Sequence, residues 1–253
     1  MFNKLLTLLY GIVCYILFVG VFSYAILFIG NIAVTPSLDF PGGGNLLEAL
    51  AINISLLAVF ALQHSIMARP AFKRKFTKII PTQVERSTYV LASTVLLGMI
   101  VYHWQPLGGV IWQLTDPTAI AIVYGLFAIG WAILFLASFQ LNHFDLFGLR
   151  QVWLHFRGKP YTHLTFKTPW LYRYVRHPLY TGLMIGLWAA PTMTAAHLIF
   201  ALLCTSYIFI GANLEERDLE KALPEYKQYK KQVPMFLPVL GTKRDNENQV
   251  KTA

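Results

Sequence analysis

Residues 179–211 read LYTGLMIGLWAAPTMTAAHLIFALLCTSYIFIG, an apolar run of 33 residues with few polar interruptions. As one straight helix the run would be about 50 Å long, whereas the hydrocarbon core of a bilayer is about 30 Å thick. The run must therefore break, and Pro191 predicts that the break lies in the segment 191–194. We expect a hairpin of a short helix, 179–190, and a longer helix, 195–211, with both open ends on one side of a membrane.

Four further apolar runs precede the hairpin, and most approach the roughly 20 residues that a helix needs to cross a bilayer. They lie at 5–29, 46–67, 89–104 and 119–139. The chain is 56% hydrophobic and 13% charged, whereas soluble domains have about 25% charged residues. These features predict an all-α, polytopic integral membrane protein with four spans and a C-terminal helical hairpin. The first run is too long for the core of a signal peptide, so we expect it to be retained.

Lysine and arginine occur only on alternate connections. Of the 21, one precedes the first run and the others lie within 69–86, 150–176 and 217–251, with none at 30–45, 105–118 or 191–196. Basic residues favour the cytoplasmic side, so this pattern predicts cytoplasmic N- and C-termini, in a bacterial inner membrane. The formal net charge of +9 then reflects topology and does not indicate a nucleic-acid partner.

The sequence predicts a single membrane domain at 1–240, with four spans in 1–140 and the hairpin with its cytoplasmic cap in 168–238. The polar tail, 241–253, predicts disorder. Cys14 and Cys204 both lie in apolar runs, and their spacing predicts neither a disulfide nor a metal site. We expect no metal and no obligate protein partner.

The hairpin brings two polar clusters together at the cytoplasmic face, one at 176–182 and one at 213–219. Pro178 suits the first position of a helix, which places Arg176 and His177 at a helix N-terminus. Such a terminus favours an anionic group such as a carboxylate. The bland alternative is an interfacial arginine beside a capping histidine.

Two acids, Glu215 and Glu216, complete the pair of clusters. Acids are disfavoured at the negative end of a helix dipole, so they require a cation, which Arg217 or a cationic ligand would supply. A solvated charged helix face is the alternative. Together the clusters suit a zwitterionic amino-acid tail, and Tyr172 and Tyr180, with Trp170, offer ring faces for an aromatic base or a sulfonium. Gly182 and Gly186 form a small-residue pair that admits either a neighbouring helix or a ligand.

These motifs carry a family resemblance. RHPLYTG at 176–182, EERDL at 215–219 and PEYKQYKKQVPMFLP at 224–238 resemble the C-terminal signature of the isoprenylcysteine carboxyl methyltransferase and phospholipid methyltransferase superfamily. The resemblance covers 168–238 and implies S-adenosylmethionine as the cofactor, bound at the cytoplasmic face. It departs from the family pattern where Ala222-Leu223-Pro224 replaces the usual Phe-Gly. The cofactor-binding residues predicted here are Tyr172, Arg176, His177, Pro178, Tyr180, Gly182, Glu215 and Glu216.

Segments before residue 152 indicate a narrower group within this superfamily. LQHSIMAR at 62–69, ERSTY at 85–89 and NHFDLFGLRQ at 142–151 are similar to segments of the bacterial methanethiol S-methyltransferases, which extends the resemblance to 10–238. This resemblance implies that a small thiol is the methyl acceptor and that dimethyl sulfide is the product.

A thiol near neutral pH is mostly protonated, while the thiolate is the nucleophile, so a base is needed. His64 lies at the end of the second span. His143 and Asp145 end the fourth span on the same side, where a carboxylate beside an imidazole would raise its basicity. We therefore expect His64, His143 and Asp145 to be the catalytic candidates. The alternative for each is a hydrogen-bonded interfacial side chain.

Other readings remain open at this point. The acceptor could instead be a prenylcysteine carboxylate or a phospholipid amine, which a lateral opening between spans would favour. A non-enzymatic accessory protein or transporter is the second alternative, and related spans occur in proteins linked to nitrogen-oxide metabolism. The remaining histidines belong to no recognisable cluster and are given no role: His103, His155, His163 and His197.

Overall fold

The computed structural model describes residues 2–162 and 165–238, so the predicted tail at 241–253 lies outside the described residues. Within these ranges five helices are long and apolar enough to span a membrane. They are α1 (Phe2–Gly30), α2 (Leu46–Ala68), α4 (Glu85–His103), α5 (Pro117–Gln140) and α9 (Ala195–Ala222). The all-α membrane fold predicted from the sequence is confirmed.

The shorter elements lie between the spans and after them. They are α3 (Pro70–Phe76), η1 (Thr82–Val84), β1 (Val110–Gln113), α6 (His143–Leu146), α7 (Leu149–Phe156), η2 (Trp170–Arg173), α8 (Pro178–Trp188), β2 (Thr192–Thr194) and α10 (Pro224–Gln232). Proline stands in the first turn of α3, α5, α8 and α10, where its missing N–H leaves no hydrogen bond unmade.

The hairpin forms where the sequence predicts it. The short helix α8 ends at Trp188, and α9 begins at Ala195 with Thr194 as its N-cap, which accepts a hydrogen bond from the backbone of His197. Two details differ from the prediction. The break contains the strand β2, which pairs antiparallel with β1, and α9 continues 11 residues beyond Gly211. The acids Glu215 and Glu216 therefore lie within α9 and not beyond its end.

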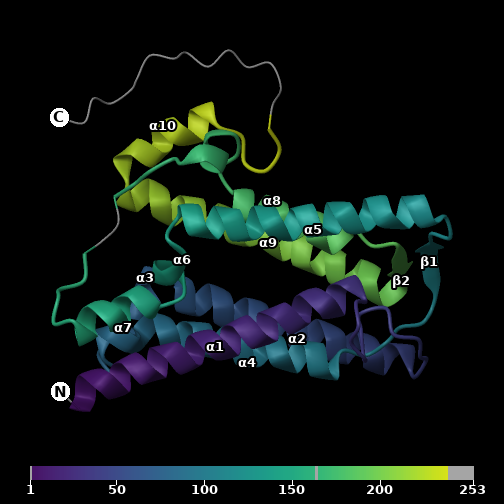
Figure 1. Ribbon diagram of the computed structural model, residues 1–253, viewed down its shortest axis with the longest axis horizontal. Coiled ribbons are helices and arrows are strands. Elements are labelled where there is room, and N and C mark those ends of the chain that lie inside the picture. The colour runs from purple at the N-terminus through teal and green to yellow at the C-terminus, as the bar shows by residue number, and fades with distance from the viewer. Residues whose placement is uncertain (1, 163–164, 239–253) are drawn as a thin grey trace.

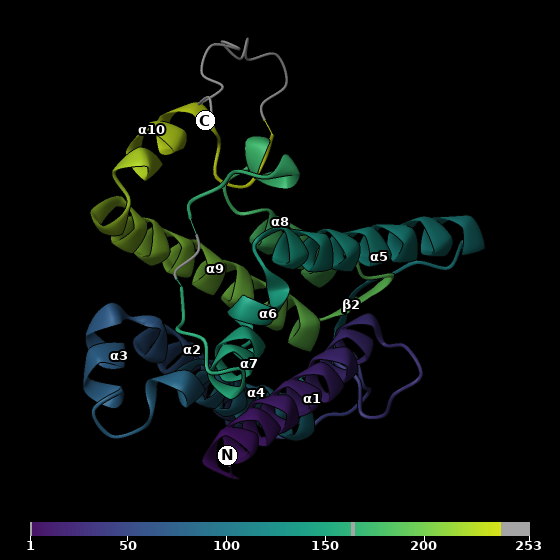
Figure 2. The same cartoon turned by 60° about the vertical axis from the view of Figure 1, so that its left-hand side comes forward.

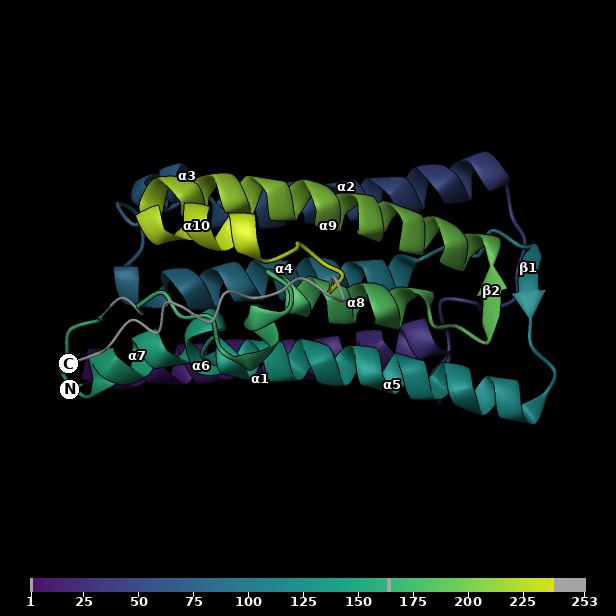
Figure 3. The same ribbon diagram turned by 90° about the horizontal axis from the view of Figure 1, so that it is seen from above.

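The helices form two layers (Figures 1 and 2). One layer contains α1, α2 and α4, and the other contains α5, α8 and α9, with α4 between α1 and α2 and α8 between α5 and α9 (Figure 3). Helices α5 and α8 approach closely because Gly182 faces Gly130: a Cβ added at Gly182 would lie 2.5 Å from the Gly130 carbonyl oxygen. The small-residue pair is therefore used for helix packing.

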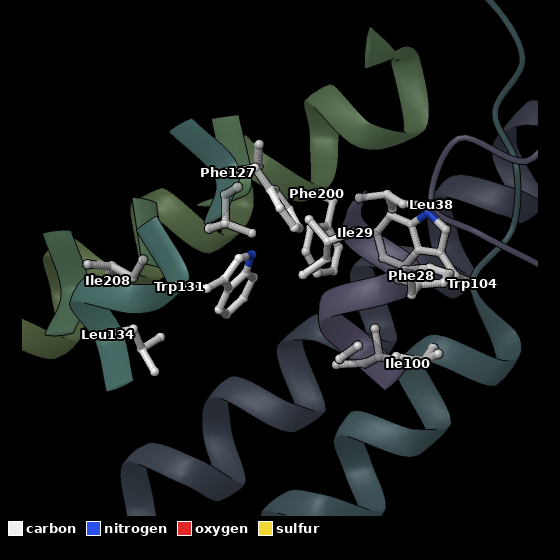
Figure 4. Packing of buried hydrophobic residues seen from close by; sticks show 14 of the residues in the cluster. Phe28, Ile29, Leu38, Ile100, Trp104, Phe127, Trp131, Leu134, Phe200 and Ile208 are labelled. Atoms are coloured by element: carbon white, nitrogen blue, oxygen red, sulfur yellow. The ribbon is translucent and has the colours of Figure 1, made fainter. Parts of the chain in front are cut away.

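An apolar cluster joins the two layers near their outer end, the end that holds β1 and β2 (Figure 4). Phe28 and Ile29 of α1 and Ile100 of α4 contribute to it from one layer, and Phe127, Trp131 and Phe200 contribute from the other. The basic elements α3, α7 and α10 lie at the opposite end (Figure 1). Charge and apolar packing are thus segregated along the membrane normal.

A buried ion pair also fastens the outer end. His197 of α9 contacts the Asp39 carboxylate over 2.7 Å, and the two side chains are 0% and 4% exposed. Asp39 also accepts hydrogen bonds from the Thr194 backbone and the Asn31 side chain. This role of His197 could not be predicted from the sequence, because its partner Asp39 lies 158 residues away in the chain.

Replacing Asp39 by alanine should lower the free energy of unfolding by about 3–5 kcal/mol, because breaking a buried pair strands a polar group. Burial raises the pKa of Asp39, but hydrogen bonds from His197, Asn31 and Thr194 outweigh it and hold the pKa below its ordinary value. The stabilisation is therefore complete above the unfolded pKa of about 4 and is lost as pH falls through the lowered folded pKa.

Thermal unfolding in detergent between pH 3 and 7 measures this difference. Asp116→Ala is the matched control, because Asp116 caps α5 at an exposed position and its loss should cost only about 1 kcal/mol. Equal losses from both variants at pH 7 would show that the Asp39 pair does not stabilise the outer end.

Candidate active site at the open end of the hairpin

The two polar clusters meet at the open end of the hairpin, as the sequence predicts. The Arg176 Nε donates to Glu216 Oε1 over 2.6 Å, and the His177 Nε2 lies 3.1 Å from the same oxygen. The Tyr180 hydroxyl donates to Glu215 Oε2 over 3.0 Å. Residues about 40 positions apart therefore form one site, and Pro178 lies in the first turn of α8 as expected.

Glu216 is the centre of a buried network that we call the Glu216 clamp, formed by Arg176, His177, Glu216, Tyr226 and Lys230. The Glu216 side chain is 1% exposed, and it pairs with Arg176, with Lys230 over 3.0 Å and with the Tyr226 hydroxyl over 3.2 Å. Its Oε1 oxygen accepts from Arg176 and Tyr226, and its Oε2 oxygen has the ion pair with Lys230 but no hydrogen bond among the described residues. The carboxylate therefore holds α8, α9 and α10 together.

The pKa shifts of Tyr226 and Lys230 are consistent with the Glu216 clamp. Burial and the nearby Glu216 carboxylate raise the pKa of Tyr226, so its hydroxyl stays protonated and donates. Contacts with Glu220 and Glu216 raise the pKa of Lys230, which keeps its ammonium charged. The clamp therefore keeps its donors over the physiological pH range.

Arg176 is directed into this clamp and is 8% exposed at its side chain. Its guanidinium also donates to the carbonyls of Lys230 and Val233. The backbone N–H groups of Arg176 and His177 donate to Pro234 and Met235. We therefore assign Arg176 to fastening the segment after α10 over the site, and its prediction as a direct ligand of an anionic group is not favoured by this geometry.

Glu215 differs from its neighbour, because its side chain is 45% exposed. Tyr180 holds its Oε2, and His177 Nδ1 lies 4.0 Å from the same oxygen. It is thus the accessible carboxylate of the pair, beside the Tyr180 ring, which stacks on His177. Tyr172 is buried, with its carbonyl accepting a 2.6 Å hydrogen bond from Tyr229.

The remaining cofactor candidate of the sequence is Gly182. It contacts the α5 backbone, as described above, so we correct its role from cofactor binding to helix packing. The two readings could not be separated from the sequence, because a small-residue pair serves either purpose.

His64 lies in a second polar cluster deeper in the bundle. Its Nε2 is 2.8 Å from the Tyr89 hydroxyl and its Nδ1 is 3.2 Å from Ser93 Oγ. The Tyr207 ring of α9 packs edge-on against the imidazole. Tyr207 lies eight residues, about two turns, before Glu215 in the same helix α9. Helix α9 thus links the His64 cluster to the accessible half of the hairpin site.

His143 and Asp145 do not form the predicted imidazole–carboxylate pair. The His143 Nε2 lies 2.8 Å from the Tyr15 hydroxyl and its Nδ1 lies 2.9 Å from Ser138. Asp145 instead pairs with Arg150 over 2.9 Å and accepts from Tyr161. The pairing fails because residues two positions apart in α6 lie about 200° apart around the helix axis. Burial lowers the pKa of His143, so its imidazole is neutral near pH 7.

Comparison with known proteins places the chain. The family model described as NnrU protein matches residues 53–233. The chain belongs to the NnrU family. It is 48% identical to a methanethiol S-methyltransferase of Crocosphaera subtropica over 95% of both chains. It is 44% identical to a methanethiol S-methyltransferase of Mycobacterium tuberculosis, over 93% of this chain and 97% of the relative. Nurim of Rattus norvegicus is 29% identical, over 80% of this chain.

The similarity that the motifs predicted is confirmed by these relatives. No solved structure matches this NnrU family member, so the roles of the site residues are inferred from the contacts described above. The sequence singled out neither Tyr226 and Lys230 of the clamp nor Tyr89 and Tyr207 beside His64. The available signal for Tyr207 was a tyrosine within an apolar span, since polar groups there are costly and tend to be functional.

Among the described residues, no group of three or more histidine, cysteine or acidic side chains has the geometry to hold a metal ion. The site is instead built from one accessible carboxylate, aromatic rings and a buried ion-pair network. This donor set fits an organic cation better than a metal, because rings and a carboxylate both stabilise a diffuse positive charge.

Proposed function

We propose that the protein is an S-adenosylmethionine-dependent methyltransferase that converts methanethiol to dimethyl sulfide. The single observation that carries the proposal is the contact of His64 with Tyr207 on α9, the helix that also carries Glu215 of the hairpin site, in a chain 41–48% identical to methanethiol S-methyltransferases. A cationic methyl donor and a thiol acceptor then each have a matching set of groups.

For the cofactor, the accessible Glu215 carboxylate and the Tyr180 ring are the groups that would face a positively charged tail or sulfonium. When bound, S-adenosylmethionine supplies an electrophilic methyl group. The Glu216 clamp would hold α10 and the segment after it over that position. Excluding water there strengthens each electrostatic contact.

For the acceptor, His64 is the proposed base. It would take the thiol proton at one ring nitrogen, once that nitrogen exchanges its hydroxyl contact for the thiol, and the hydroxyl on the other nitrogen would fix the ring orientation. The thiolate would then be the nucleophile toward the methyl group that a bound S-adenosylmethionine would supply, by direct displacement with inversion. Holding both reactants in this geometry supplies much of the rate. His143 remains a second candidate, and it lies beside α1, in contact with Tyr15.

The test uses purified protein with S-adenosylmethionine carrying a labelled methyl group and a panel of thiols, prenylcysteines and phospholipids. Dimethyl sulfide should appear with methanethiol, and titration calorimetry should detect S-adenosylhomocysteine. Labelled lipid or prenylcysteine without labelled dimethyl sulfide would favour the alternative acceptors. Folded protein that binds neither form of the cofactor would refute the proposal.

We also propose that both termini lie in the cytoplasm, so that the site opens to the cytoplasmic pool of cofactor. The support is the confinement of basic residues to one end of the bundle. Reporter fusions at Lys78, Lys159 and the C-terminus should read as cytoplasmic, and one at Gly43 as external. An external signal from the fusion at Lys159 would show that the orientation is the reverse of the one proposed.

A further inference from the structure

The two helix layers meet along two edges, and these edges differ in chemistry. Along one edge side chains of α1 contact those of α5, and along the other α2 packs on α9 (Figures 2 and 3). An acceptor with a long hydrocarbon chain would need one of these edges to open, because its chain would have to extend from the buried site into the bilayer.

The α1–α5 edge is closed by apolar packing. The rings of Phe22 and Trp131 meet edge to face, with centroids 5.7 Å apart. Gly30 lies so close to Phe127 that an added Cβ would be 2.8 Å from its ring. The Tyr124 hydroxyl also donates to the Gly30 carbonyl. Separating this edge would expose the aromatic cluster of Figure 4.

The α2–α9 edge is closed by two polar contacts, which we call the α2–α9 latch: Ser65 with Tyr207, and Arg69 with Asp218. The two hydroxyls are 3.0 Å apart. The Arg69 guanidinium donates to Asp218 over 2.9 Å, and its Nε also donates to the Ser65 carbonyl. Each contact joins residues more than 140 positions apart, so the latch is a tertiary feature.

The latch lies directly beside the proposed reaction site. Ser65 follows His64 in α2, and its partner Tyr207 is the ring that packs against the His64 imidazole. Asp218 lies two residues beyond Glu216 in α9. The same two helices present exposed apolar side chains, among them Leu62 and Ile66 on α2 and Phe209 and Ile210 on α9. An acceptor approaching from the bilayer along these faces would have to part both contacts of the latch.

We infer that the α2–α9 latch determines acceptor size, admitting thiols of one or two carbons and excluding acceptors that carry a long hydrocarbon chain. The inference rests on the proposed function and names its specificity determinant. An exposed ion pair and a hydroxyl–hydroxyl contact are each of modest strength. Removing both should therefore open the edge without unfolding the bundle.

The experiment compares kcat/KM for methanethiol, ethanethiol, butanethiol and octanethiol in protein reconstituted in nanodiscs. Wild-type kcat/KM should fall steeply with chain length. Ser65→Ala/Asp218→Ala should raise the octanethiol-to-methanethiol ratio roughly tenfold, the combined effect of two such contacts, with methanethiol turnover retained as evidence of folding. Glu220→Ala is the matched control, since it removes an α9 carboxylate paired with Lys230 outside the latch, and it should keep the wild-type profile.

Exchanging the charges of Arg69 and Asp218 distinguishes loss of the latch from a general loosening of the helix packing. Arg69→Asp alone should widen the chain-length profile, and adding Asp218→Arg should restore the wild-type profile. Equal profiles for wild type and the latch variants, or efficient wild-type methylation of octanethiol, would overturn the inference while leaving methanethiol methylation intact. Wild-type protein that methylates no thiol of any length would overturn the proposed function, and this inference with it.

Discussion

Replacing Glu216 by alanine should abolish measurable binding of S-adenosylhomocysteine and destabilise the protein by about 3–5 kcal/mol. The Glu216 carboxylate is the shared acceptor of Arg176, Tyr226 and Lys230, and its removal leaves a buried guanidinium without its acid. The segment after α10 would then lose its anchor over the site. Titration calorimetry and thermal unfolding in detergent measure the two effects. Asp116→Ala, at the exposed N-cap of α5, is the control, which should keep wild-type binding and cost only about 1 kcal/mol.

Glu215→Gln separates the clamp from direct contact with the cofactor. Its side chain is half-exposed, so the substitution should leave thermal stability near that of wild type. If the carboxylate faces the cationic cofactor, affinity should still fall roughly tenfold, the effect of one charge-assisted hydrogen bond. A Glu216→Ala protein that is folded and binds the cofactor with wild-type affinity would contradict the clamp.

Replacing His64 by alanine should lower kcat/KM for methanethiol by about 10²–10⁴-fold near neutral pH, the usual contribution of a general base. The loss should shrink at alkaline pH, because solution then supplies more thiolate. Affinity for S-adenosylhomocysteine should stay close to wild type, since His64 lies outside the Glu216 clamp. Initial rates across pH 6–10, with calorimetry at one pH, measure all three quantities.

His143→Ala is the matched comparison, because each histidine lies near one end of a span and is hydrogen-bonded to a tyrosine. It should keep most of its activity and show no alkaline rescue. If His143→Ala is the variant rescued by alkali, then His143 is the base and the His64 assignment is wrong. If both variants lose cofactor binding, these histidines serve the fold.

The membrane architecture could be predicted from the sequence because its cause is local. Each span is a contiguous apolar run whose length matches the bilayer, and the break at 191–194 follows from a proline in a run too long to cross once. The meeting of Arg176 with Glu216 follows as well, since a hairpin returns the chain to the surface it left. The predicted end of α9 at Gly211 was too early. The helix continues beyond it, into the residues whose acids the Glu216 clamp holds.

The division of roles between neighbours was decided only by the tertiary structure. Glu215 and Glu216 are chemically identical and adjacent, but about 100° of helical rotation separates them, so packing against α8 and α10 buries one and leaves the other accessible. Tertiary packing likewise determined that His197 pairs with Asp39 and that Asp145 pairs with Arg150. The sequence determined which polar groups reach the membrane surface, and the rotation and contact of helices distant in the chain determined which of them pair and which remain free to react.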